Sequence, residues 1–185
     1  MILEKASGGD FRAIRAIYRE SFPPEELMPW WLLRLTAGGR HAEVLAAREG
    51  GEIIGFAYSL LRADIVYFFF FAMEKDHRGQ GYGSKILSEV QRRYAGRRIF
   101  LGRESLDPGA ENYAQRLRRV AFYRRNGFHD LPERITEAGC SFDVMGTGDL
   151  VLPEEYDALI NAWCGKLIRR AIGFRMELTE EASAR

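Results

Sequence analysis

Apolar positions in the first part of the chain follow the spacings of one strand and two helices. Residues 1–5 read as a short strand, and the apolar residues after Asp10 recur every three or four positions, which predicts a helix that ends before Pro23. A second apolar stretch around Trp30 and Trp31 predicts another helix after a proline-rich break.

Three apolar runs in the middle of the chain have the composition of β-strands. The runs 42–48 and 53–61 flank Gly50 and Gly51, and a glycine pair tolerates the positive φ of a tight hairpin turn. We therefore expect these two strands to be antiparallel neighbours. The third run, 65–73, reads IVYFFFFAM and is apolar at both parities, so it should lie centrally in a sheet that is covered on both faces.

The second half of the chain alternates helix and strand patterns. First come a helix that ends near Tyr94 and a strand over 98–104. A helix over 112–125 follows, with Gly127 as its cap and an apolar side made of Tyr113, Leu117, Val120 and Ala121. A final strand over 141–145 precedes a helix from Pro153, whose apolar stripe runs from Tyr156 to Leu167. The tail after about Leu178 is expected to be frayed. The pattern predicts mixed α and β structure around one sheet.

The composition is that of a globular protein. With 185 residues, of which 46% are hydrophobic and 29% charged, the chain can bury a core without disulfides or metals. Its 27 basic and 26 acidic residues balance, which argues against a nucleic-acid partner. The longest apolar run is far shorter than the ~20 residues of a membrane helix, and no apolar signal run opens the chain. We expect a soluble cytoplasmic protein with no membrane partner and no metal.

The strongest chemical signal is the glycine cluster that separates the central strand from a helix. Its glycines would let the backbone approach an anion, and the first N–H groups of the helix favour phosphate. The spacing lacks the Gly-Lys-Ser/Thr triplet of a Walker A loop and the G-x-G-x-x-G of a dinucleotide site. Taken alone, the cluster could still be a plain glycine turn.

Two segments resemble motifs of the GNAT superfamily of N-acetyltransferases. Arg78-x-x-Gly81-x-Gly83 is similar to the loop that binds the pyrophosphate of coenzyme A in that family. Residues 122–128, Phe-Tyr-Arg-Arg-Asn-Gly-Phe, are similar to the family's F-Y-x-x-x-G-F segment. The two segments stand in the family's order with a predicted strand between them.

The resemblance implies an α/β fold of the α+β type. A GNAT-like acyl-CoA N-acyltransferase fold has a central mixed, mostly antiparallel sheet that is flanked by helices and splayed at the coenzyme site. The resemblance covers residues 1–150 as the acetyltransferase domain, and leaves 151–185 as a C-terminal helical extension with a frayed tail. The apolar stripe of that extension could pack on the core or on a second copy of the chain, as in a homodimer.

The resemblance also implies how acetyl-CoA, the cosubstrate, would bind. The backbone at Phe71, Ala72 and Met73 would pair with the pantetheine arm, and the Met73 amide would donate to the thioester carbonyl. The pyrophosphate would be bound by the loop residues Arg78, Gly79, Gln80, Gly81, Tyr82, Gly83 and Ser84.

Tyr123 matches the family tyrosine that points at the thioester sulfur. A phenol with a pKa near ~10 is matched in basicity to a thiolate, so Tyr123 is the expected general acid, with core packing as the alternative. Glu104, at a strand end, is the expected general base, with an ion-paired glutamate as the alternative. Glu26 could attract a cationic amine, and Trp30 and Trp31 could wall that groove by cation–π contact, with core packing as the alternative for both.

Together these features predict an N-acetyltransferase that transfers an acetyl group from acetyl-CoA to a primary amine of a small molecule by direct attack in a ternary complex. Two other interpretations stay open. The chain could be a non-catalytic acyl-CoA-binding or sensor module, since Arg116 stands where many family members carry asparagine. It could also acetylate protein N-termini or lysines, which would require an open groove.

Overall fold

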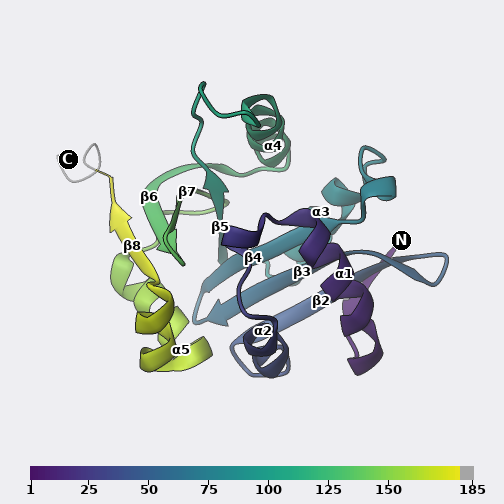
Figure 1. Ribbon diagram of the computed structural model, residues 1–185, viewed down its shortest axis with the longest axis horizontal. Helices are drawn as coiled ribbons and strands as arrows, with labels where there is room; N and C mark the ends of the chain where they lie inside the picture. Colours follow the sequence, from purple (N-terminus) through teal and green to yellow (C-terminus); the bar gives the residue numbers. More distant parts are fainter. Residues whose placement is uncertain (180–185) are drawn as a thin grey trace.

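The computed structural model describes residues 1–179 (Figure 1), so the tail predicted to fray lies outside the described residues from position 180 onward. The strands are β1 (Ile2–Lys5), β2 (Ala42–Glu49), β3 (Glu52–Arg62), β4 (Ile65–Met73), β5 (Arg98–Glu104), β6 (His129–Glu137), β7 (Cys140–Gly146) and β8 (Arg175–Leu178). The α-helices are α1 (Phe11–Ser21), α2 (Trp30–Thr36), α3 (Tyr82–Arg93), α4 (Tyr113–Arg125) and α5 (Pro153–Ile172). Short 3₁₀ turns cover Gly8–Asp10, Pro24–Glu26 and Lys75–His77.

The strands form one sheet in the order β1-β2-β3-β4-β5-β7-β6-β8. Within residues 1–179, neighbouring strands pair antiparallel except β4 and β5, which pair parallel. The predicted mixed, mostly antiparallel sheet flanked by helices is therefore confirmed. The predicted hairpin of β2 and β3 and the central position of β4 are confirmed as well.

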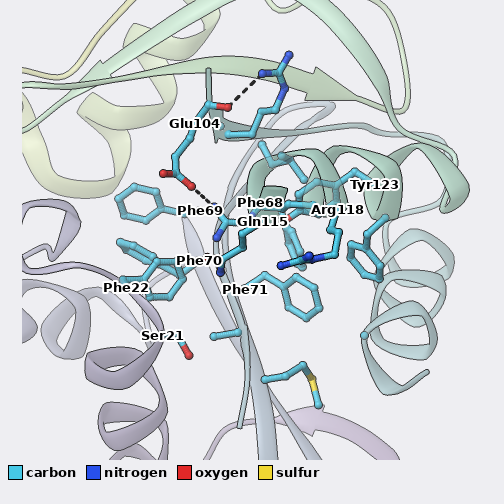
Figure 2. Close-up of a pocket in the computed structure, with 18 of the residues that line it drawn as sticks. Ser21, Phe22, Phe68, Phe69, Phe70, Phe71, Glu104, Gln115, Arg118 and Tyr123 are labelled. Carbon is cyan, nitrogen blue, oxygen red and sulfur yellow. Dashed lines mark hydrogen bonds and ion pairs between the residues drawn. The ribbon is translucent and has the colours of Figure 1, made fainter. Parts of the chain in front are cut away.

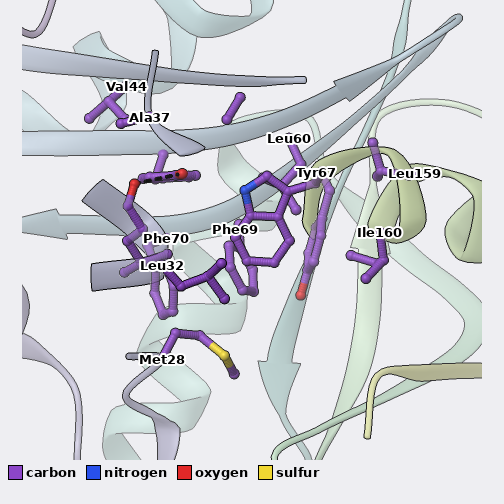
Figure 3. Close-up of a cluster of buried hydrophobic side chains, with 14 of the residues drawn as sticks. Met28, Leu32, Ala37, Val44, Leu60, Tyr67, Phe69, Phe70, Leu159 and Ile160 are labelled. Atoms are coloured by element: carbon purple, nitrogen blue, oxygen red, sulfur yellow. Dashed lines mark hydrogen bonds between the residues drawn. The ribbon is translucent and has the colours of Figure 1, made fainter. Parts of the chain in front are cut away.

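Helices cover both faces of the sheet, so the apolar side chains divide into two core clusters. The first cluster joins the sheet to α1, α2 and α5, and Figure 3 shows part of it around Leu32, Phe69 and Leu159. The second cluster joins the opposite face to α3 and α4 through Ile86, Val90 and their neighbours. Among residues 1–179, no helix is long and apolar enough to cross a membrane.

A bulge in β4 resets which side chains face which cluster. Tyr67 and Phe69 contact the first cluster while Phe68, between them, contacts the second. The pairing with β3 then shifts by one residue, from Ser59↔Phe68 to Tyr58↔Phe70. Phe69 is the extra residue, so Phe69 and Phe70 both face the first cluster. The four consecutive phenylalanines thus serve both cores.

The sheet splits into two halves between β4 and β5. Parallel pairing joins only Ile65–Tyr67 of β4 to Arg98–Phe100 of β5. Beyond these residues β5 continues beside β7, and in Figure 1 it points up toward α4 while β4 runs across the molecule. This divergence is the predicted splay of the sheet.

Two strands were missed by the sequence patterns, and the prediction that 141–145 is the final strand was wrong. The β6 sequence HDLPERITE is largely polar, and its pairing with β7 is interrupted between Asp130 and Arg134, around Pro132, which has no N–H to give to a ladder. The β8 strand has only four residues and pairs with β6.

Two helical stripes also differ from prediction. In α4, Leu117 is 42% exposed, because the inward stripe is shifted and runs through Arg116, Arg119, Val120 and Tyr123. Ala121 is exposed for the same reason.

In α5, Leu167 is 84% exposed although Leu159 and Trp163 are buried. Gly165 has φ 82° and ψ 158°, a non-helical conformation that interrupts the helix and breaks its periodicity. Before this break α5 belongs to the first core cluster, so its stripe packs on the sheet of its own chain.

The two leucines of α5 give a matched test of this packing. Leu159→Ala should lower the free energy of unfolding by about 2–5 kcal/mol, because it leaves a cavity in a fully buried site. Leu167→Ala should change it by less than about 0.5 kcal/mol. Urea unfolding of both variants measures the difference, and equal losses would contradict this placement of α5.

Candidate active site

A cavity of about 600 Å³ fills the gap between β4 and β5 (Figure 2). Its walls are the diverging ends of the two strands, the glycine loop before α3, one face of α4 and the segment after α1. Five sequence-predicted elements of the site meet here, represented by Phe71, Gly81, Glu104, Tyr123 and Glu26.

The glycine loop presents backbone N–H groups at one end of the cavity. Gly79 and Gly81 have φ of 75° and 81°, in the left-handed region that favours glycine. Gly81 is the N-cap of α3 and no side chain caps the helix, so the first-turn N–H groups are available to an anion. Arg78 fixes the loop: its Nε donates to the Met73 carbonyl (3.0 Å) and its Nη2 to Ser21 Oγ (3.0 Å).

A glycine is also required one residue into α3 because three elements meet there. A Cβ on Gly83 would lie 3.2 Å from Phe122 Cζ and 3.7 Å from Phe71 Cζ. The absence of a side chain at Gly83 therefore lets α3 approach both α4 and β4. This close approach narrows the cavity beside the loop.

Not every predicted loop residue lines the cavity. Arg78, Gly79, Gly81, Gly83 and Ser84 do. The structure directs two side chains elsewhere: Gln80 Nε2 donates to the Asp76 carbonyl (2.8 Å), and the Tyr82 ring lies 6.1 Å from His77.

Beyond Tyr67, the edge of β4 that faces the cavity has no pairing with β5. Glu74 N–H donates to the Ile54 carbonyl on the β3 side. Because successive residues of a strand direct their N–H groups to opposite edges, Met73 and Phe71 direct theirs toward the cavity. Phe71, Ala72 and Met73 all line it.

Tyr123 lies in the cavity wall contributed by α4. It is 9% exposed, and its ring packs against Phe122 (5.3 Å) and Phe128 (5.7 Å). Its hydroxyl makes no hydrogen bond within residues 1–179. Burial raises the pKa of Tyr123 above its ordinary value, so the phenol carries its proton at neutral pH.

Glu104 is an ion-paired carboxylate. Arg119 Nη1 donates to its Oε2 (2.6 Å), Asn112 Nδ2 donates to its Oε1 (2.9 Å), and Arg116 Nη2 lies 3.1 Å from Oε1. Both oxygens are occupied by donors, two of them charged.

Glu26 lines the same cavity from the turn after α1. Burial raises its pKa to about 6, and the negative charge of Glu104 acts in the same direction. Within residues 1–179 it makes no ion pair, so it is better suited than Glu104 to accept a proton near neutral pH.

Glu137 is a cavity residue that the sequence patterns missed. It lies at the end of β6, is 6% exposed, and accepts hydrogen bonds at Oε1 from the hydroxyls of Tyr156 (2.7 Å) and Tyr67 (2.9 Å). Burial raises its pKa to about 7, although both hydroxyls favour the charged form. No local pattern marks it, because β6 itself was not predicted.

Trp30 and Trp31 do not line the cavity, contrary to the expectation from sequence. They border a separate hollow with Arg15, Arg34 and Leu35. Trp30 packs on Tyr18 of α1 (5.8 Å), and Trp31 is 60% exposed. The reason is the orientation of α2, whose Leu32 and Leu33 are the residues turned into the core.

The cavity has ends of opposite charge. Arg78 contacts β4 at Met73, whereas Glu137 contacts it at Tyr67, and six residues of strand at ~3.3 Å each separate these points by about 20 Å. Arg118 and Arg125 of α4 add positive charge to the lining. Within residues 1–179, no group of three or more His, Cys, Asp or Glu side chains is placed to hold a metal ion.

Solved structures of known proteins share this fold. A protein from Bacteroides thetaiotaomicron described as a GNAT-family acetyltransferase has a TM-score of 0.68 at 23% identity, over 94% of this chain and 99% of its own. An aminoglycoside 6'-N-acetyltransferase in complex with coenzyme A has a TM-score of 0.61 at 16% identity, over 83% of this chain and 99% of its own. A ribosomal-protein-alanine N-acetyltransferase from Brucella melitensis has a TM-score of 0.57 at 20% identity, over 81% of this chain and 100% of its own.

The sequence gives a second line of comparison. No curated protein sequence matches the chain. Residues 40–130, which run from β2 through α4, match the family described as the acetyltransferase (GNAT) domain. With the family's glycine loop, its tyrosine segment and its splayed sheet all present, the chain belongs to the GNAT superfamily of acetyltransferases.

Proposed function

We propose that the chain is an acetyl-CoA-dependent N-acetyltransferase whose acceptor is a primary amine of a small molecule, attacked directly in a ternary complex. The observation that carries the proposal is the cavity between β4 and β5, which joins an anion-binding loop to a group of carboxylates and includes Tyr123 in its wall. Anionic coenzyme and cationic acceptor would thus enter from ends of opposite charge.

The loop end suits coenzyme A. Backbone N–H groups from Gly79 to Ser84 would bind the pyrophosphate, with Arg118 and Arg125 as further cations for phosphate. The pantetheine arm carries amides, and the N–H groups of Phe71 and Met73 at the unpaired edge of β4 would pair with it as with an added strand.

Most of the rate enhancement would come from positioning. Holding thioester and amine together removes ~7–11 kcal/mol of barrier, and one preorganised backbone donor at the carbonyl oxygen, for which Met73 is the candidate, adds ~3 kcal/mol. The amine nitrogen attacks the thioester carbon, and the C–S bond breaks as the tetrahedral intermediate collapses. Tyr123 gives its proton to the departing thiolate.

We assign the role of proton acceptor for the bound ammonium to Glu26 and not to Glu104, the base expected from the sequence. Glu104 is engaged by Arg116, Arg119 and Asn112, so its role would be to position those side chains. Glu26, which has a raised pKa and makes no ion pair within the described residues, would accept the proton directly or through water.

Relatives of the same fold do not decide the acceptor. One is named for an aminoglycoside and another for a ribosomal-protein alanine. The carboxylates Glu26 and Glu137, of which Glu137 is buried, lie in a cavity lined by aromatic side chains and favour a small cationic amine. The direct test is thiol release from acetyl-CoA with a panel of amines, with product identified by mass; release with peptides alone would favour a protein acceptor.

Tyr123→Phe tests the general acid. Removing the hydroxyl should lower kcat by about 10²-fold or more, because the thiolate must then leave without a proton, while the Kd of acetyl-CoA stays within about twofold. Steady-state thiol release and calorimetry measure the two quantities. A variant with unchanged kcat would assign Tyr123 to packing.

Glu26→Gln tests the base. A pKa of about 6 leaves Glu26 protonated and inactive at lower pH, so kcat/KM of the wild type should rise about tenfold per pH unit below pH 6 and level off above it. The variant should lose this rise and most of the activity. If Glu104→Gln abolishes the rise and Glu26→Gln retains it, the base is Glu104.

A further inference from the structure

Glu137 is a buried carboxylate that the reaction as described above does not use. Its Oε1 accepts the hydroxyls of Tyr67 and Tyr156, but its Oε2 accepts no hydrogen bond within residues 1–179. The side chain is 6% exposed and borders the cavity. Its Oε2 atom has no hydrogen-bond partner within residues 1–179 but keeps some exposure to solvent. Oε1 is therefore fixed by two hydrogen bonds, while Oε2 faces the cavity without a partner within the described residues.

Burying such a carboxylate is costly unless a donor or a cation meets it. Within residues 1–179 no arginine pairs with Glu137, and two arginines of the cavity lining are bound elsewhere, Arg119 to Glu104 and Arg103 to Asp130 and Asp143. The negative charge of Glu26 reaches Glu137 and Tyr67, so the two carboxyls lie near enough to repel each other. A cation bound at this end would relieve that repulsion.

The walls around Glu137 define the rest of the ligand. Tyr67, Phe69 and Phe142 line this part of the cavity, and their rings suit methylene groups and an ammonium ion. A ligand carboxylate would instead face Glu26 and Glu137 and be repelled. The chemistry that fits is an aliphatic chain with a cationic end.

We propose, on the basis of the acetyltransferase function proposed above, that the acceptor is an aliphatic diamine or polyamine, whose distal ammonium group is bound by Glu137 Oε2 while its other amine is acetylated beside Glu26. Glu137 is then a specificity residue, since it touches the substrate away from the reacting atoms. The hydroxyls of Tyr67 and Tyr156 keep its free oxygen aimed into the cavity.

The test compares straight-chain diamines of three to six carbons with monoamines and amino alcohols of matched length. The best diamine should exceed its matched monoamine in kcat/KM by about tenfold or more, the gain expected of one charge-assisted contact. Equal values for diamine and monoamine would overturn the second-cation site while leaving the acetyltransferase function intact. Thiol release with none of the amines, by protein that binds acetyl-CoA, would instead refute the proposed function.

Glu137→Gln removes the charge and keeps a carbonyl oxygen to accept the two tyrosine hydroxyls. It should raise KM about tenfold more for diamines than for monoamines of matched length. The matched control is Glu133→Gln, a buried carboxyl four residues earlier on β6 that accepts the Val151 amide (2.5 Å) and does not line the cavity. A loss shared equally by diamines and monoamines in Glu137→Gln would overturn the proposal.

An inhibitor gives a test that needs no variant. A fully N-methylated diamine keeps two cationic groups but has no N–H to be replaced by an acetyl group. It should inhibit competitively against the diamine at a concentration about tenfold lower than the matched methylated monoamine. Equal inhibition by the two compounds would count against a second cation site even if Glu137→Gln failed to fold.

Discussion

The structure depends on the early parting of β4 from β5. Only Ile65–Tyr67 of β4 pairs with β5, yet β4 continues to Met73. Backbone groups that would normally complete a ladder are left facing a cavity, and α3, α4 and the glycine loop lie around that edge and keep it from being an open edge strand. The bulge at Phe69 lies where the strands part, and it lets one apolar strand supply both cores while its edge stays open.

Charge is distributed along that edge in a way that matches two different ligands. The loop, Arg78, and Arg118 and Arg125 of α4 make one end basic, and Glu26 and Glu137 make the other end acidic. Glu104 does not add to the second end as an open carboxylate, because it neutralises two arginines that would otherwise repel a cationic acceptor. Under the proposed function, fold and charge would order acetyl-CoA and the amine along one channel.

The features that could be predicted from the sequence are those that local patterns determine. The run of residues 65–73 is apolar at both parities, and this alone implies a central strand. Gly79, Gly81 and Gly83 stand at fixed offsets from a helix start, and Tyr123 lies in a short motif before a glycine cap. Local spacing is enough for such features because neighbouring residues determine the geometry.

The parts that could not be predicted depend on contacts distant in sequence. Glu137 is hydrogen-bonded by Tyr67 and Tyr156, which are 70 and 19 residues away in the sequence. It also lies on β6, a strand whose pairing with β7 is interrupted around Pro132. The ion pairs of Glu104 and the direction in which Trp30 points likewise follow from how helices dock, which spacing within one helix does not fix. Glu137 and the strand after α4 that carries it were missed for this reason.

The measurement that most directly tests the central claim is amide hydrogen exchange with and without acetyl-CoA. If the coenzyme binds along the open edge of β4, the amides of Phe71 and Met73 and those of the loop from Gly79 to Ser84 should slow markedly, while β1 and β2 exchange as before. Saturating acetyl-CoA that leaves the Phe71, Met73 and loop amides exchanging at their original rates would contradict the account.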